Sequence, residues 1–183
     1  MPKSSSFTLK ANGGLLRALI TKCKISQGFD PATGLAIPRF IEVNAIWDTG
    51  ATASVITQHV VDQCGLQPTG MTRVQGVHGT NDVETYLVNI LLPNNVGFKH
   101  VSVTKGDLGD GAHALIGMDI ITEGDFCITN KDNITMFSFR YPSLLHVDYV
   151  AEHQAQVAKE KFGHGGSKND RKHRHKTFGK NKH

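Results

Sequence analysis

The sequence has few cysteines and no long apolar run, and each lack excludes a class of protein. Cys23, Cys64 and Cys127 are odd in number, far apart and free of CxxC or Cys/His spacing, so they indicate neither a disulfide framework nor a zinc site. The first ten residues contain no apolar stretch of signal-peptide length, and no run approaches the ~18 residues of a membrane span. We therefore expect a cytoplasmic protein with no membrane attachment, no metal and no other cofactor.

Positive charge is concentrated at the C-terminal end. The formal net charge is +4. Residues 163–183 hold seven Lys or Arg against one Asp, which makes +6, so the other 162 residues sum to −2. This segment has almost no apolar residue except Phe178, and we expect a basic disordered tail. Its charge predicts weak contact with a nucleic acid or an acidic partner, or else a solubilising extension.

Short segments of alternating hydrophobicity predict an all-β fold. Ile41, Val43, Ala45 and Trp47 occupy alternate positions, as in a strand with one buried face. A hairpin is expected within residues 15–36, and further strands are expected at 71–77, 83–92, 98–104, 126–129 and 134–139. These elements predict a small β barrel or sandwich.

One short helix is expected inside this β domain, at Gln58–Cys64. Thr57 is a suitable N-cap, and Gly65 follows the last helical residue. The composition then divides the chain into an N-terminal extension, the β domain, a helix-prone segment and the tail, at 1–14, 15–142, 143–162 and 163–183.

Three features along the chain carry the chemical argument. A hydrophobic strand ends in Asp-Thr-Gly-Ala at 48–51. A carboxylate there leaves the sheet edge in a tight turn, where Gly50 permits close backbone approach. An ordinary turn fits the same residues, so the tripeptide alone does not define a site. A hairpin tip with Gly76 and Gly79 follows, and then an apolar strand that ends at Gly117.

In this order the three features resemble the retropepsin-like aspartic protease family, over about residues 15–140. Ala51 is typical of the single-domain retroviral type rather than the two-lobed pepsin type, and Leu-Ile-Gly-Met-Asp at 115–119 looks closer to cellular and bacterial members than to viral ones. Viral members pair an Arg after that glycine with an acidic residue. Here Met118 replaces the Arg and Thr52-Ala53 replace the acids, which predicts a different internal support.

The resemblance implies a small closed barrel-like acid-protease domain that is dimeric. Peptide hydrolysis by this chemistry needs two carboxylates that share one proton, one as general base and one as proton donor. Asp-Thr-Gly occurs once in the chain, so a homodimer acting on a peptide or protein substrate is expected. The expected catalytic residues are Asp48, Thr49 and Gly50. The expected substrate-binding residues are Ala51, Gly76, Val77, His78, Gly79, Ile116 and Gly117.

Within this assignment, Thr49 would join a hydrogen-bond lattice across the dimer axis, and residues 73–83 would form a flap over an extended peptide. We interpret Asp119 as structural, and Asp107 and Asp110 as parts of a solvated turn without calcium-loop spacing. Two other functions stay open: a non-catalytic dimeric adaptor that binds peptide in the same groove, and nucleic-acid binding through the tail.

Overall fold

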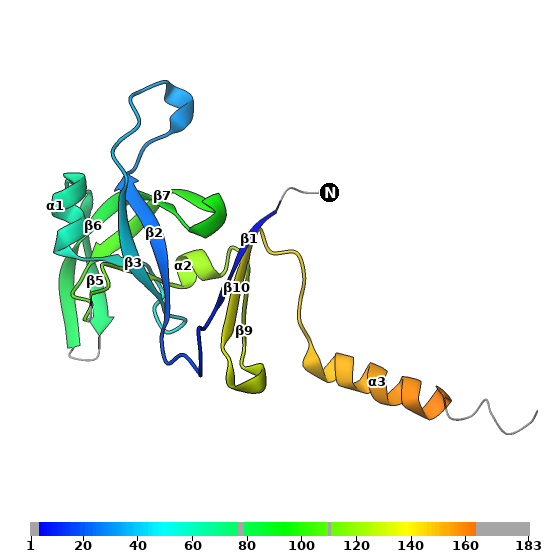
Figure 1. Ribbon diagram of the computed structural model, residues 1–183. Helices are drawn as coiled ribbons and strands as arrows, with labels where there is room; N and C mark the ends of the chain where they lie inside the picture. The colour runs from blue at the N-terminus through cyan, green and yellow to red at the C-terminus, as the bar shows by residue number, and fades with distance from the viewer. Residues whose placement is uncertain (1–3, 77–78, 110, 164–183) are drawn as a thin grey trace, which may run out of the picture. The chain divides into compact units, whose positions relative to one another are not determined.

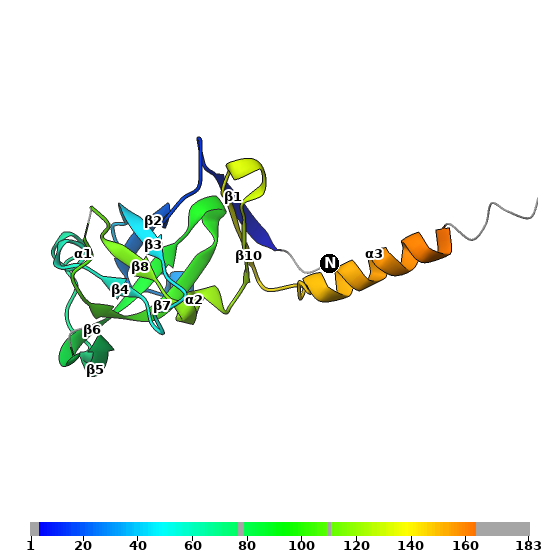
Figure 2. The ribbon, with the colours of Figure 1, turned by 90° about the horizontal axis from the view of Figure 1, so that it is seen from below.

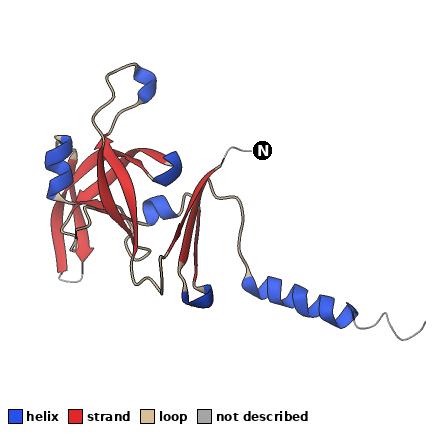
Figure 3. Cartoon of the chain, in the orientation of Figure 1, coloured by secondary structure: helices blue, strands red, loops and turns tan. Residues whose placement is uncertain are grey.

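The computed structural model of the protein describes residues 4–76, 79–109 and 111–163. The chain forms two units that divide between Leu144 and Leu145. The first unit is built mainly of strands, and the second contains the helix α3 (Tyr149–Gly163) (Figure 3). The all-β prediction for the domain and the helix-prone segment are both confirmed. No helix within the described ranges is long and apolar enough to cross a membrane.

Six strands close into a barrel, as predicted. They are hydrogen-bonded in the order β2-β3-β8-β4-β7-β6, and β6 also pairs with β2, which completes the ring. β5 pairs with β6 and extends beyond the ring as one arm of a hairpin. The bounds are β2 (Leu19–Gln27), β3 (Ile41–Trp47), β4 (Val55–Ile56), β5 (Gly70–Gly76), β6 (Gly79–Leu91), β7 (Gly97–Lys105) and β8 (Ala114–Ile116).

The barrel core follows the expected alternation. In β3 the side chains of Ile41, Val43, Ala45 and Trp47 are buried, and the residues between them are more exposed. β3 pairs antiparallel with β2 and parallel with β8. β3 therefore has a hydrogen-bonded neighbour on each side, and Asp48, which follows its last residue Trp47, leaves the sheet from a strand that is held at both edges.

A second, three-stranded antiparallel sheet stands beside the barrel (Figures 1 and 2). Its strand order is β1 (Ser5–Lys10), β10 (Met136–Tyr141), β9 (Asp125–Thr129). β1 lies within the residues that we expected as an extension, because only Phe7 and Leu9 are apolar in this strand and the pattern is weak. The boundaries proposed for the four parts of the chain stay a prediction.

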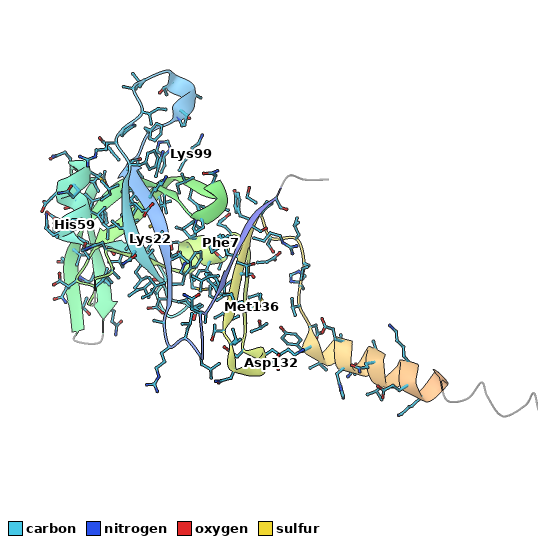
Figure 4. The ribbon with its side chains drawn as sticks, viewed as in Figure 1. Phe7, Lys22, His59, Lys99, Asp132 and Met136 are labelled. Atoms are coloured by element: carbon cyan, nitrogen blue, oxygen red, sulfur yellow. The ribbon has the colours of Figure 1, made fainter. Side chains whose placement is uncertain are left out.

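Aromatic side chains join this sheet to the barrel. The rings of Phe7, Phe126, Phe137 and Phe139 lie with their centroids 5.0–5.9 Å from that of Trp47, and Figure 4 labels Phe7 at this junction. The Trp47 indole N–H is satisfied, since it donates to the Thr21 hydroxyl at 2.9 Å. The sheet therefore packs against the residue that directly precedes Asp48.

The predicted helix is confirmed as α1 (Gln58–Cys64), and Gly65 follows it with the left-handed φ of 62°. A single further turn of helix, α2 (Met118–Ile121), follows β8. Four residues are too few for helical periodicity to appear in the sequence. α2 lies between the barrel and the three-stranded sheet in both views (Figures 1 and 2).

Three 3-10 turns complete the first unit: η1 (Pro31–Thr33), η2 (Pro93–Asn95) and η3 (Lys131–Asn133). The loop of residues 28–40, which contains η1, joins β2 to β3 and projects from one end of the barrel (Figure 1). The β5–β6 hairpin extends at the other end.

We expect Phe137→Ala to lower the free energy of unfolding by about 3–5 kcal/mol, because a fully buried ring in the aromatic cluster is lost. Its neighbour Met136 is 42% exposed, so Met136→Ala should stay within about 0.5 kcal/mol. Chemical denaturation of both variants measures the difference. Equal small losses in the two variants would contradict the packing described here.

Candidate active site

Asp48 begins a tight loop at the end of β3. Its N–H donates to the Ile116 carbonyl of β8 at 3.0 Å, and its own carbonyl accepts from the Ala51 N–H at 3.3 Å. The carboxylate Oδ1 accepts the Gly50 N–H at 2.8 Å. These contacts fix the side-chain direction while Asp48 stays only partly buried. A carboxylate that is oriented by the backbone and still reached by water can act on a bound water or substrate.

Gly117 has no room for a side chain. A β-carbon at this residue would lie 2.7 Å from the carbonyl carbon and oxygen of Ala53 and 3.0 Å from the carbonyl oxygen of Ala51. The backbone that follows β8 therefore touches the backbone of the Asp48 loop directly. The adjacent Met118 N–H donates to the Ala51 carbonyl at 2.8 Å, which adds a hydrogen bond to this contact.

Asp119 holds the other end of the same loop. The Ser54 hydroxyl donates to Asp119 Oδ1 at 2.8 Å, and the Ser54 N–H donates to Asp119 Oδ2 at 3.0 Å. The same hydroxyl oxygen accepts the Gly117 N–H at 3.1 Å. Both carboxylate oxygens of Asp119 are thus engaged by Ser54, which agrees with the structural role that we gave this residue. A serine and an aspartate therefore support this end of the loop.

The predicted glycine-bearing hairpin is formed by β5 and β6, whose register ends at the pair Gly76 and Gly79. The tip residues Val77 and His78 lie outside the described residues. Gly79 has a φ of 115°, a conformation that favours glycine. Near the tip, Arg73 Nε and Asp82 Oδ1 form a cross-strand ion pair at 3.0 Å, which is exposed and adds little stability.

An ionic contact at the base of this hairpin was not predicted. The carboxylate of Glu84, on β6, accepts from the Lys105 ammonium of β7 and from the Tyr86 hydroxyl. The hydrogen bond from Lys105, followed by that from Tyr86, holds the pKa of Glu84 below its usual value. These contacts tie the hairpin to the barrel wall. Nothing in the local sequence links Glu84 to Lys105, which lies 21 residues further on.

The expected site residues fall into two groups in space. Asp48, Thr49, Gly50 and Ala51 form one loop, with Thr49 and Gly50 exposed, and β8 brings Ile116 and Gly117 against it. The side chain of Ile116 is fully buried, so this residue supports Asp48 through its carbonyl. Gly76 and Gly79 belong to the separate β5–β6 hairpin.

Among the described residues, the other reactive side chains do not form a second candidate active site. Burial, with a smaller effect of Glu42, raises the pKa of the Cys23 thiol to about 12, so Cys23 is not a nucleophile although it lines a surface hollow on β2. His59 and His113 stack with ring centroids 4.3 Å apart. Within the described ranges there is no group of three or more His, Cys, Asp or Glu that could hold a metal ion.

A model of one known protein family matches part of the chain. Residues 40–123, which include the Asp48 loop, the hairpin and α2, match the family model described as "gag-polyprotein putative aspartyl protease". The match covers less than half of the 183 residues, and over this part the chain is similar to that family. No curated protein matches the chain.

Several solved structures resemble the protein distantly. A retropepsin-like aspartic protease from Rickettsia conorii is 15% identical, with a TM-score of 0.43, and the match covers 77% of this chain and 98% of the other. EIAV protease in complex with an inhibitor is 19% identical, with a TM-score of 0.45 and coverage of 61% and 91%. The retroviral protease-like domain of Ddi1 from Leishmania major is 20% identical, with a TM-score of 0.39 and coverage of 67% and 95%. The closer kinship with cellular and bacterial members stays a prediction.

We expect Asp119→Asn to lower the free energy of unfolding by about 1–3 kcal/mol, because an amide nitrogen cannot accept the hydrogen bond that one carboxylate oxygen now accepts from Ser54. Asp132→Asn, at an exposed turn, is the matched control and should have almost no effect. Combining Asp119→Asn with Ser54→Ala should cost less than the sum of the single changes. Strict additivity in denaturation experiments would argue against the contact.

Proposed function

We propose that the protein is an aspartic endopeptidase that acts as a homodimer and cleaves extended peptides. One observation carries the proposal: the single Asp-Thr-Gly of the chain places a partly exposed carboxylate at the end of a buried strand, where the Gly50 N–H orients it. The family match over residues 40–123 supports the same reaction.

The chemistry requires two such carboxylates. With Asp48 from each chain ~3 Å apart, both groups cannot ionise together, so the pair holds one proton between them. The ionised group removes a proton from water while the protonated group donates to the carbonyl oxygen of the peptide. Thr49, which is exposed beside Asp48, is proposed to bond across the two-fold axis, and Gly50 leaves space for water and substrate.

The three-stranded sheet supports pairing next to Asp48. Its apolar face packs on Trp47, one residue before the catalytic loop. In the described chain β9 pairs only with β10, so the outer edge of β9 is available for another strand. A partner bound at this sheet would bring its own Asp48 loop close to that of the first chain.

The β5–β6 hairpin is proposed as the flap. Gly76, Val77, His78 and Gly79 would close over the peptide with backbone contacts, and Ala51 and Gly117 would line the floor beneath it. A surface hollow on the hairpin is lined by Met71, Thr72, Arg73 and Asp82, which offers space for substrate side chains. All three cysteines are free, which supports the proposed cytoplasmic location. Contact of residues 163–183 with a nucleic acid or an acidic partner stays a prediction, and residues 164–183 lie outside those described.

Asp48→Asn should abolish peptide cleavage, with a loss of at least ~10³-fold, and leave the dimer intact, because the amide keeps the shape of the loop but cannot act as base. Asp107→Asn, at an exposed aspartate outside the loop, is the control and should keep full activity. A peptide library assayed with both variants and the parent gives the comparison. Unchanged cleavage by the Asp48 variant would refute the assignment.

A peptide with a central hydroxyl in place of the scissile amide should bind at least ~10²-fold more tightly than the matching plain peptide, because it resembles the tetrahedral species formed on water addition. Calorimetric titration of the parent measures both affinities. Equal affinities would favour the adaptor without catalysis over the protease.

Specific activity should fall on dilution, since each chain supplies one Asp48 and separated chains hold half a site. Sedimentation measured over the same concentrations should show dimers separating into single chains in parallel. Activity that stays constant through the dissociation range would rule out a site shared between chains.

A further inference from the structure

Among the described residues, the loop of residues 28–40 carries two of the three most exposed large apolar side chains. Leu35 and Ile37 are 74% and 70% exposed. Residues 31–38 contain no charged side chain, and all of them except Pro38 are exposed. Apolar side chains that gather at one exposed place are costly in water and mark a contact surface. Residues 35–37, here called the apolar tip, therefore form a candidate contact surface.

The loop is fastened to the barrel at its base. The Gly28 N–H donates to the Leu87 carbonyl of β6 at 2.9 Å. The side-chain amide of Asn89, which is 5% exposed, donates to the Phe29 carbonyl at 2.7 Å. The rings of Phe29 and Phe40 meet edge to face, with centroids 6.0 Å apart, so the two ends of the loop are joined where it leaves the barrel. The apolar tip is therefore presented at a defined place.

A turn inside the loop precedes the apolar tip. In η1 the Asp30 carboxylate accepts the Ala32 N–H at 3.0 Å, and the Thr33 hydroxyl donates to the Asp30 carbonyl at 2.7 Å. Gly34 ends the turn with the left-handed φ of 71°, a conformation that favours glycine. The turn is thus held by its own hydrogen bonds. The exposure of Leu35, which follows it, therefore belongs to a formed loop.

The charge beside the apolar tip is positive. Asp30 and Arg39 are the only charged residues in the sequence of the loop. The Lys99 ammonium of β7 lies 3.5 Å from Asp30 Oδ1 and offsets its charge, which leaves the exposed Arg39 two residues beyond the tip. Residues 163–183 add a charge of +6 to the chain. An anionic surface would therefore attract the loop and the tail alike.

A lipid surface fits this loop better than a protein does. Figure 1 shows the loop projecting from one end of the barrel, so the apolar tip is convex and narrow. A stable protein interface takes ~800 Å² from each partner, which is more than two large side chains and one alanine offer. A bilayer needs no matching shape, because apolar side chains enter at the acyl boundary while cations stay among the headgroups.

We propose that the apolar tip inserts into the surface of an anionic lipid bilayer, with Leu35 and Ile37 among the acyl chains and Arg39 beside the headgroup phosphates. The inference goes beyond the proposed function and does not rest on it. It revises the expectation of no membrane attachment, which was drawn from the lack of a spanning run, because a peripheral contact needs no such run. Two inserted side chains bind only weakly, so the charge of the tail is expected to add to the contact.

This contact would leave the β5–β6 hairpin accessible. The 28–40 loop and the hairpin extend from opposite ends of the barrel (Figure 1). A bilayer at the loop would therefore stand away from the hairpin, and lipid binding and peptide cleavage can be measured independently.

The first test is sedimentation of the purified full chain with lipid vesicles. The chain should bind vesicles that mix phosphatidylcholine with phosphatidylglycerol at least ~10-fold more tightly than vesicles of phosphatidylcholine alone, because the loop and the tail are cationic. High salt should weaken binding to the mixed vesicles. If the chain binds neither kind of vesicle, the proposal is wrong, and the apolar tip would then be a contact for another protein. Equal affinity for the two kinds would also contradict it, since an anionic surface is proposed.

A matched pair of double variants separates insertion of the tip from attraction by charge. Leu35→Ser with Ile37→Ser should weaken binding to the mixed vesicles at least ~10-fold, because two inserted apolar side chains are lost while the net charge stays the same. Leu145→Ser with Val147→Ser makes the same kind of change at the same spacing, at residues that are 50% and 54% exposed, and should bind as tightly as the parent. Equal loss in both pairs, or no loss in either, would refute the proposal.

A tryptophan placed in the apolar tip reports insertion directly. Trp47 is the only tryptophan of the chain and is 6% exposed, so its emission should not change on binding. In Leu35→Trp, the mixed vesicles should shift the added emission to shorter wavelength and shield it from a water-soluble quencher, because the ring leaves water. In Leu145→Trp they should do neither. Vesicle binding without these changes at position 35 would mean that another part of the chain holds the lipid, and would overturn the proposal.

Discussion

The approach of Gly117 to the backbone of Ala53 is the contact on which the candidate site depends. A β-carbon would lie 2.7 Å from two backbone atoms of Ala53, a distance that real side chains do not adopt. The glycine lets β8 and the Asp48 loop meet without a side chain between them. Two backbone hydrogen bonds, from Asp48 to Ile116 and from Met118 to Ala51, then fix the loop on both sides of this contact. The direction of the Asp48 carboxylate therefore depends on these backbone contacts as well as on its hydrogen bond from the Gly50 N–H.

The support of the loop uses little charge. Asp119 is partly buried and receives two hydrogen bonds from Ser54, where an ion pair would need two desolvated groups of opposite sign. When one partner of a buried ion pair is lost, an uncompensated charge is left. Here the Ser54 hydroxyl donates to Asp119 and accepts from the Gly117 N–H, so a chain of hydrogen bonds replaces a pair of charges. The chain has no acidic residue at 52 or 53 and no Arg at 118. The contacts of Ser54 with Asp119 stabilise the loop without them.

Local signals in the sequence predicted much of the fold. Gln58–Cys64 was found because Thr57 and Gly65 mark its two ends, and β3 was found because four apolar residues alternate before Asp48. β4 and α2 were missed since two and four residues are too short to show a period. Contacts between residues far apart in the chain could not be predicted from local patterns. Ser54 and Asp119 are 65 residues apart. The rings around Trp47 come from three strands, and the alternation of apolar residues does not show that these strands form one sheet. The motif order identified the Asp48 loop, but only the structure relates Asp119 to it.

The pairing of β1 with β10 sets the first and last strands of the barrel unit side by side, with Ser5 opposite Tyr141. The two ends of this unit are therefore neighbours, so the unit can be inserted into a longer polypeptide without stretching the segments on either side. The same neighbourhood makes it a candidate for circular permutation: a short bridge between the two strands, with new ends opened in the 28–40 loop, would keep every barrel pairing. The order of the strands along the chain can therefore change while their arrangement in space stays the same.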